Sequence, residues 1–107
     1  MALPVDVRRA FGFALSLAQM GDRADAVKVM QGFGGACVLE VIEDDAHGTY
    51  RAVYTVRYPE AVFVLHCFQK KSHQGIATPR EDMEIIHGRL KIAAALVKEW
   101  RNEKARR

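Results

Sequence analysis

Two strand-like runs between Thr49 and Lys71 carry the side chains best suited to chemistry in this chain of 107 residues. Arg51 lies near the start of the first run, and His66, Lys70 and Lys71 lie along the second run and just after it. If the two runs pair as a hairpin, one small sheet holds an arginine, a histidine and two lysines together. Cationic donors of this kind can bind a phosphate without a metal ion, and a histidine can exchange protons near neutral pH.

A polar loop and the start of a helix follow this basic group. His73 lies in the loop, and Arg80 lies in the first turn of the helix predicted after Thr78. The free amides of a helix N-terminus favour phosphate, whereas the acidic residues of segment 81–84 oppose it. The alternative interpretation is a solvated rim of charges, in which the two lysines protect an exposed strand edge. The sequence leaves both interpretations open.

Other kinds of site find no support in the spacing of the residues. The glycine-rich segment 32–35 leads into a strand, whereas phosphate-binding glycine loops open a helix. The histidines have no helical or knuckle spacing, and the adjacent His66 and Cys67 point to opposite faces of a strand. Cys37 and Cys67 lie in apolar runs and are interpreted as small buried hydrophobes rather than as a disulfide. We therefore expect no metal site and no cofactor.

Alternation of residue types predicts three strands in succession. Residues 50–58 alternate with a period of two, which places Arg51 on the face opposite the tyrosines. Residues 37–43 precede this run and residues 62–68 follow it, and both are rich in branched or aromatic side chains. On the last strand His66 shares its face with the residues two and four positions further on. Short polar breaks separate the three runs, so an antiparallel meander is expected.

Helical spacing of apolar residues predicts a helix at each end of the chain. The first covers residues 5–20 and stops near Gly21, and residues 25–30 are a candidate for a short second helix. Thr78 is followed directly by a proline, which suits the first helical position, and three residues later by Glu81. This capping box predicts the start of the last helix. The charged tail 101–107 is expected to fray. The last helix has an apolar stripe that should pack on the sheet: Met83, Ile86, Leu90, Ala93, Val97 and Trp100.

The whole chain, residues 1–107, has the length of one domain, and its element order predicts an α+β fold. An N-terminal helix or helical hairpin packs on a small antiparallel sheet, and a long C-terminal helix follows. The net charge of +3 is compatible with an anionic partner. No apolar run is long enough to span a bilayer, and the N-terminus lacks the pattern of a signal peptide. A cytoplasmic protein is expected.

The order of these motifs resembles that of the phage-derived HigB-like toxins of the RelE/ParE superfamily. The resemblance runs from about Val7 to Ala95, and its most specific parts are LEV with YRAVYT, then VLHCFQKKS and TPREDMEIIHGRL. It implies the toxin of a type II toxin–antitoxin pair, usually folded as two N-terminal helices on a curved antiparallel sheet. RelE-like members cleave mRNA in the ribosomal A site, and the HigB antitoxin is a small helix-turn-helix protein. ParE-like members inhibit DNA gyrase instead.

The resemblance also implies roles for individual residues. Arg51 matches the phosphate-contacting arginine in the Tyr-Arg strand of RelE-like toxins. Lys70 and Lys71 loosely match the basic residues at the end of the following strand. RelE-like toxins use a late tyrosine as an acid or base, whereas this chain has no tyrosine after Tyr58. That departure leaves a ParE-like target open.

The leading hypothesis is a ribosome-dependent, metal-independent mRNA endoribonuclease. The RNA 2′-hydroxyl would attack the adjacent phosphate, which leaves a 2′,3′-cyclic phosphate and a free 5′-hydroxyl. Such a reaction needs a base, an acid and cations beside the phosphate. We assign Arg51 and Lys71 to phosphate stabilisation. Lys70 or His66 would be the base, and His73 would be the acid.

Further expectations concern partners. Arg51, the two lysines and Arg80 are the expected nucleic-acid contacts, and the ribosome and mRNA are the expected targets. A cognate helix-turn-helix antitoxin is the expected protein partner. The N-terminal helix has more apolar residues than one buried face can use, so Phe13 and Leu15 are expected to contact that partner. The alternatives are a toxin that inhibits gyrase without nuclease activity and an inactive remnant that binds only its antitoxin.

Overall fold

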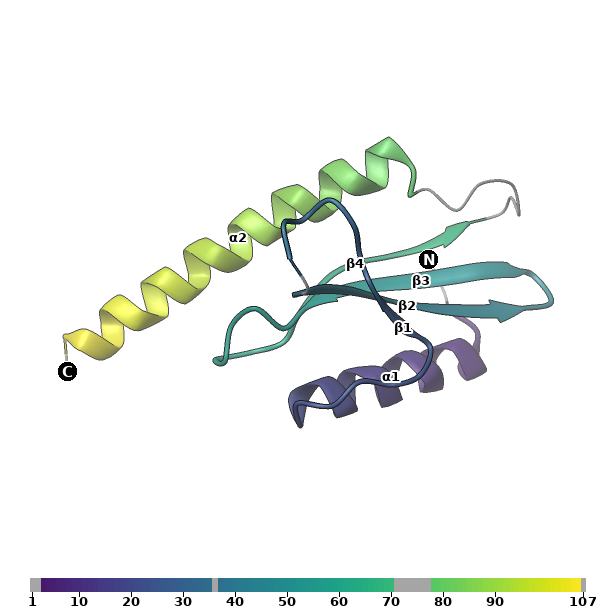
Figure 1. Ribbon diagram of the computed structural model, residues 1–107, viewed down its shortest axis with the longest axis horizontal. Coiled ribbons are helices and arrows are strands. Elements are labelled where there is room, and N and C mark those ends of the chain that lie inside the picture. Colours follow the sequence, from purple (N-terminus) through teal and green to yellow (C-terminus); the bar gives the residue numbers. More distant parts are fainter. Residues whose placement is uncertain (1–2, 36, 71–77, 107) are drawn as a thin grey trace.

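One helix, four strands and a second helix follow one another along the chain. The computed structural model describes residues 3–35, 37–70 and 78–106. The elements are α1 (Val5–Gln19), β1 (Val27–Val29), β2 (Val38–Asp45), β3 (Gly48–Thr55), β4 (Phe63–Lys70) and α2 (Arg80–Ala105). The strands form one sheet, with α1 on one side of it and α2 on the other (Figure 1). The predicted α+β fold is confirmed.

Neighbouring strands of the sheet are all antiparallel, in the order β1-β2-β3-β4. The hairpin of β2 and β3 closes where Asp45 pairs with Gly48. The amide of His47 donates to Oδ1 of Asp45 at 2.7 Å, and Gly48 has a φ of 141°, which residues with a Cβ rarely adopt. This tight turn fixes the register of β2 on β3 and therefore decides which side chains of the two strands meet.

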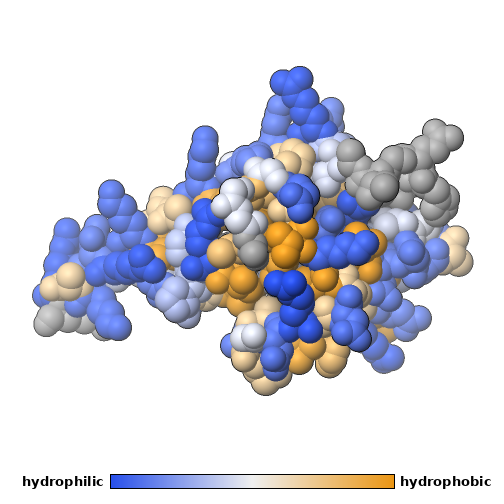
Figure 2. Space-filling model, viewed as in Figure 1, coloured by the Kyte–Doolittle hydropathy of each residue, from blue (hydrophilic) through white to orange (hydrophobic). Residues whose placement is uncertain are grey.

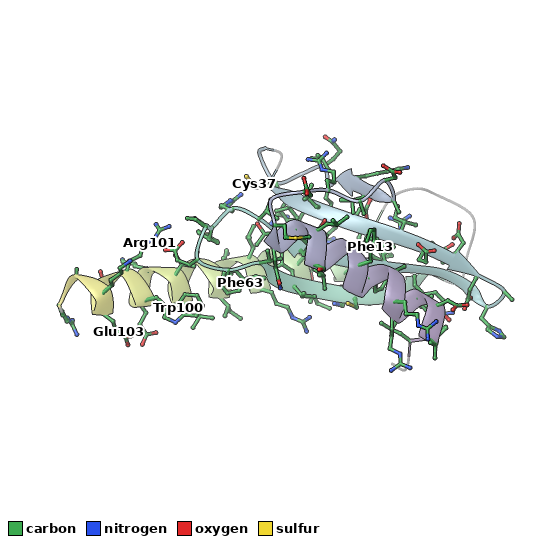
Figure 3. The ribbon with its side chains drawn as sticks, turned by 90° about the horizontal axis from the view of Figure 1, so that it is seen from below. Phe13, Cys37, Phe63, Trp100, Arg101 and Glu103 are labelled. Atoms are coloured by element: carbon green, nitrogen blue, oxygen red, sulfur yellow. The ribbon has the colours of Figure 1, made fainter. Side chains whose placement is uncertain are left out.

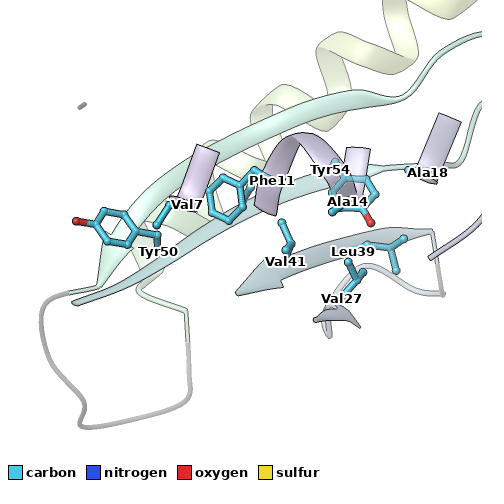
Figure 4. Close-up of a cluster of buried hydrophobic side chains, with 10 residues drawn as sticks. Val7, Phe11, Ala14, Ala18, Val27, Leu39, Val41, Tyr50 and Tyr54 are labelled. Atoms are coloured by element: carbon cyan, nitrogen blue, oxygen red, sulfur yellow. The ribbon is translucent and has the colours of Figure 1, made fainter. Parts of the chain in front are cut away.

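The helix α1 packs one apolar face on the sheet. Its buried residues recur every three or four positions, so they lie on one side of the helix: Val7, Phe11, Ala14 and Ala18. They contact the sheet face that carries Tyr50, Ala52 and Tyr54 (Figure 4). Gly21 follows the helix with a φ of 82°, which confirms the stop predicted there.

The helix α2 covers the opposite face of the sheet. Three residues of its predicted stripe, Ile86, Ala93 and Val97, are buried, and Ile86 joins a second apolar cluster with Val53 and Phe68. The C-terminal half of α2 projects beyond the sheet (Figure 1). Hydrophilic side chains gather over this projection, whereas apolar ones gather over the sheet (Figure 2). The projection gives the molecule a length of 52 Å, against 27 and 25 Å in the other directions.

Residues 25–30, a candidate for a short helix, form the strand β1 instead. Val27 pairs with Val41, and Val29 pairs with Leu39. The three-residue strand is stabilised by hydrogen bonds to β2 and by burial of Val27 in the α1 cluster, so spacing within the segment cannot reveal it. The N-terminal layer of the described structure is therefore one helix, not the helical hairpin or the two helices that the resemblance implies.

The ends of α2 also differ from the prediction. Pro79 is the N-cap residue, and no side chain forms a capping hydrogen bond, so the predicted capping box is wrong. Acidic residues in the first turn still stabilise this end through the helix dipole. The tail that was expected to fray is helical through Ala105. One reason is the contact of Arg101 with Glu60. Nε of Arg101 donates to Oε2 of Glu60 at 2.5 Å, and Nη2 donates to Oε1 at 3.0 Å.

Candidate active site

Arg51 lies inside the sheet rather than on its rim. The strand β3 has a neighbour on each side, and Arg51 is only 6% exposed. Its Nη1 donates to Oε2 of Glu40 on β2 at 3.4 Å. Its buried Nε has no hydrogen-bond partner among the described residues. The guanidinium therefore has one carboxylate at a long distance and one buried donor without a partner among the described residues.

His66 on β4 lies between two charged residues of α2. Its Nε2 lies 2.7 Å from Oδ1 of Asp82, and its Nδ1 lies 3.4 Å from Nη1 of Arg89. Its ring stacks on that of Phe68 with the centroids 5.2 Å apart, and the side chain is 13% exposed. The imidazole is therefore held in one orientation, as a group that transfers a proton must be.

The strand register brings Arg51 and His66 to the same face of the sheet. Arg51 pairs with Phe68, and Val53 pairs with His66. Paired residues of antiparallel strands point to the same side, and so do residues two apart along a strand. Arg51 and His66 are thus diagonal neighbours on the face that α2 covers. Tyr50 and Tyr54 pack on the other face, so the predicted separation of Arg51 from these two tyrosines is confirmed, whereas Tyr58 lies beyond the end of β3.

Three predicted site residues lie at the end of β4 or after it. Lys70 is the last residue of β4, and its backbone pairs with Thr49 near the start of β3. Lys70 therefore belongs to the same end of the hairpin as Arg51. Lys71 and His73 lie outside the described residues, so the roles given to them rest on the sequence alone.

Arg80 lies at the first position of α2 and faces solvent. Its Nε donates to Oε1 of Glu84 at 3.2 Å, and its side chain is 91% exposed. This exposed pair within one helix turn adds little to stability. Of the predicted site residues whose side chains are described, the structure brings together Arg51 and His66, with Arg80 at the start of the covering helix.

A third cation, Arg89, lies beside His66. Its Nη1 donates to the carbonyl of Leu65 at 2.8 Å. Val53 pairs with His66 whereas the next residue pairs with Val64, which leaves Leu65 without a partner in the ladder. An irregularity of this kind re-aims groups at a sheet edge. Arg89 and residues of β4 line an open pocket of about 390 Å³ at that edge.

Cys67 lies on the wall of the same pocket. Burial raises the pKa of its thiol, and the nearby positive charge of Arg89 acts in the opposite direction. The thiol therefore stays protonated near neutral pH, so it is a weak nucleophile. Cys67 and Cys37 are both free thiols and both are partly buried, as expected for small apolar residues.

Glu40, Asp82 and Arg89 belong to this cluster although no sequence pattern selected them. At the sequence level, Asp82 is one of several acids that oppose phosphate at a helix start. It precedes Arg89 by seven residues, which is about two helical turns and places both on one helix face. That spacing was the available signal. Glu40 gives no such signal, because its contact with Arg51 depends on the register of β2 on β3.

The predicted partner residues of α1 lie in different surroundings. Phe13 is 62% exposed on the outer side of the helix (Figure 3). Leu15 is partly buried and packs against the cluster beneath α1. Phe13 is therefore available to another molecule in full, whereas Leu15 also contributes to the core.

Two further features bear on the range of chemistry. Among the described residues, no group of three or more histidine, cysteine, aspartate or glutamate side chains converges as a metal ion would require. Neither described helix has the length and apolar character needed to cross a membrane.

The cluster provides an imidazole with fixed neighbours and two guanidinium groups, which suits phosphate binding and proton transfer.

A comparison with protein families identifies the family of the chain. Residues 1–91 match the family described as phage-derived protein Gp49-like (DUF891). The match covers 91 of the 107 residues and includes both sheet and site. No curated protein and no solved structure matches the chain. The chain belongs to the phage-derived Gp49-like family, which is a family of RelE/ParE-like toxins.

Proposed function

We propose that the protein is the toxin of a HigB-like type II toxin–antitoxin pair and that it cleaves mRNA on the ribosome. Its membership in a family of RelE/ParE-like toxins supports the toxin role. The observation that carries the nuclease role is the proximity of Arg51 and His66 on one face of the sheet, with Asp82 at 2.7 Å from the imidazole. A cation for the phosphate and a group for the proton are what RNA cleavage without a metal requires.

The reaction would be a transesterification within the RNA. A base removes the proton of a 2′-hydroxyl, the oxygen forms a bond to the adjacent phosphorus, and the bond to the 5′-oxygen breaks. Arg51, with Lys71, stabilises the charge on the crowded phosphate. His66 or Lys70 is the base, and His73 protonates the leaving oxygen. The products are a 2′,3′-cyclic phosphate and a 5′-hydroxyl, and the protein acts in the cytoplasm, where ribosomes are.

A second candidate is a ParE-like toxin that inhibits DNA gyrase without cutting RNA. Two observations favour it. The chain has no tyrosine after Tyr58, where RelE-like toxins have one, and Arg51 is buried beside Glu40, which fits a structural role. A remnant that binds only its antitoxin is consistent with the same observations.

The protein partner in this proposal is a small helix-turn-helix antitoxin. The exposed ring of Phe13 on α1 supports a contact there, because a large aromatic side chain is a frequent anchor of protein interfaces. Leu15 is partly buried, so only the accessible part of its side chain would contact the antitoxin. Binding at α1 would occupy the side of the sheet opposite to His66, so inhibition would come from blocking entry to the ribosome rather than from covering the site.

Induction of the chain without its partner tests the nuclease proposal. Translation should stop before DNA replication, and mRNA fragments should end in a 2′,3′-cyclic phosphate. Cleavage on purified ribosomes should persist in EDTA when enough magnesium remains to keep the ribosomes intact. His66→Gln should lose cleavage, whereas His47→Gln, a matched change at the exposed hairpin turn, should keep it. Arrest of replication first, with intact mRNA, would favour the gyrase candidate instead.

A further inference from the structure

We infer that Arg89, His66 and Asp82 form one unit at the edge of β4, in which Arg89 binds the scissile phosphate and Nδ1 of His66 is the base. Asp82 is a positioning residue that determines which nitrogen of the imidazole carries the proton. The inference rests on the proposed cleavage of RNA and names the groups that would perform it. Neither the sequence patterns nor the family match assigns a role to Arg89 or to Asp82.

The two neighbours of His66 specify the same tautomer. A guanidinium only donates hydrogen bonds, so the Nδ1 that faces Arg89 at 3.4 Å must carry a lone pair. An ionised carboxylate only accepts them, so the Nε2 that faces Asp82 at 2.7 Å must carry the proton. The imidazole is thus held with its basic nitrogen toward the arginine. This arrangement follows the logic of a catalytic triad, in which a buried carboxylate orients a histidine base.

Arg89 is better placed than Arg51 to meet an incoming phosphate. Arg51 is 6% exposed and has Glu40 as a partner. Arg89 is exposed, and among the described residues its side-chain contacts are the neutral groups Leu65 carbonyl and His66 Nδ1. Within the described part of the chain, no carboxylate forms an ion pair with this guanidinium. The carbonyl anchors the guanidinium, which leaves its remaining donors for an anion.

The space for a substrate is the open pocket at the edge of β4. Arg89 and His66 both line it, and Leu3 and Val64 add an apolar wall. A phosphate there would sit beside the guanidinium, and a ribose or base could lie on the apolar wall. Arg89 would exchange its long contact with Nδ1 for the phosphate and keep its shorter bond to Leu65. Nδ1 would then be free to accept a proton.

The proton balance of the step is simple. Nδ1 accepts the proton of the 2′-hydroxyl as the 2′-oxygen forms its bond to phosphorus and the bond to the 5′-oxygen breaks. The acid of the proposed reaction protonates the departing 5′-oxygen, and water then carries the proton of the imidazolium back to that acid. No proton or electron is gained or lost overall, so no further reactant is needed.

The first test is cleavage on ribosomes by purified variants. Arg89→Gln and Asp82→Asn should each lower the rate by about 100-fold or more, in the range for a charge-stabilising donor or an oriented base. Lys98→Gln removes the same charge from the same helix about 13 Å further along. It should stay within about twofold of the parent, because charges beyond a Debye length are screened. If the parent cleaves mRNA and the Arg89→Gln variant cleaves it at the same rate, the inference is overturned while the proposed function still stands.

The second test uses the free protein and does not depend on cleavage. The ¹⁵N signals of His66 should show the proton on Nε2. Asp82→Asn should move part of the population to the Nδ1–H tautomer, because an amide can donate to a bare Nε2, and the same spectrum reports whether the variant is folded. Inorganic phosphate should shift the His66 signals in the parent but not in Arg89→Gln. If the parent cleaves no mRNA, the proposed function fails. The unit itself is refuted if His66 of the parent carries its proton on Nδ1, or if phosphate still shifts the His66 signals in Arg89→Gln.

Discussion

Arg51 on β3 and Glu40 on β2 form an ion pair within the sheet, with Nη1 and Oε2 3.4 Å apart and side chains only 7% and 13% exposed. The two residues are diagonal neighbours, since Glu40 pairs with Val53 and Arg51 pairs with Ile42. The pair joins the two strands β2 and β3 in the interior of the sheet. Arg51 therefore has a structural role whether or not it contacts RNA, and its two roles must be measured separately.

Arg51→Ala should lower both stability and toxicity. It leaves the carboxylate of Glu40 largely buried without its partner, which should cost about 2–4 kcal/mol in the free energy of unfolding, somewhat below the range for fully buried pairs. Adding Glu40→Gln should recover part of that loss in urea titrations. The double variant should be folded and still fail to inhibit growth. Toxicity equal to the parent at equal expression would show that Arg51 is not a phosphate ligand.

Trp100→Ala should loosen the projecting half of α2. The indole stacks on Phe63 with the ring centroids 5.8 Å apart and an angle of 17° between planes (Figure 3). Loss of this pair should cost about 1–2 kcal/mol, since Trp100 is partly exposed. Amide hydrogen exchange should accelerate first in the last turns of the helix. Ile92→Ala, at a more exposed position of α2, is the control and should change neither measurement; equal effects of the two variants would contradict the anchoring role.

The contact between Glu60 and Arg101 should make stability depend on pH in the acid range. The Arg101 side chain lowers the pKa of the Glu60 carboxyl from its ordinary value of 4.5. A carboxyl with a lowered folded-state pKa stabilises the protein above its unfolded-state pKa, and this contribution is lost as the pH falls through the folded-state value. The parent should therefore melt above Glu60→Gln at neutral pH, and the difference in Tm should vanish in acid. A constant difference at all pH values would show that the contact does not titrate with folding.

Phe13→Ala and Leu15→Ala should separate antitoxin binding from folding. Phe13 is 62% exposed, so its removal should weaken the complex by about 2 kcal/mol or more if it is an anchor, with no change in Tm of the free toxin. Leu15 packs against the core, so its removal should lower Tm as well. Calorimetry of the complex measures the effect of each variant on binding, and Tm of the free toxin measures its effect on folding. An unchanged affinity of Phe13→Ala would move the interface away from α1.

Replacing Lys70 and Lys71 with Gln should reduce the salt dependence of ribosome binding. Each lysine that contacts a phosphate of single-stranded RNA contributes about 0.7 to the slope of log affinity against log salt. The double variant should therefore lose about 1.4 from that slope. Lys98→Gln with Lys104→Gln removes the same charge from the exposed end of α2 and should leave the slope unchanged. A slope unchanged in both would favour a protective role of the lysines at the strand edge.

The elements whose residues repeat at a fixed period were predictable from the sequence alone. The helix predicted at residues 5–20 is α1, and the alternating run after Tyr50 is β3, with Arg51 and the tyrosines on opposite faces. The succession of three long strands and a final helix was equally readable. Periodicity works here because each element buries one face against a neighbour, and the buried face leaves the same pattern whatever that neighbour is.

Which side chains meet across elements depends instead on how the whole chain packs. β1 is a strand because β2 offers it an edge, not because of its own spacing. Glu40 reaches Arg51 through the register set at the turn between Asp45 and Gly48. Asp82 and Arg89 reach His66 because of where α2 lies along the length of β4. Register and helix position depend on packing summed over the whole chain, so no local pattern of residues records them.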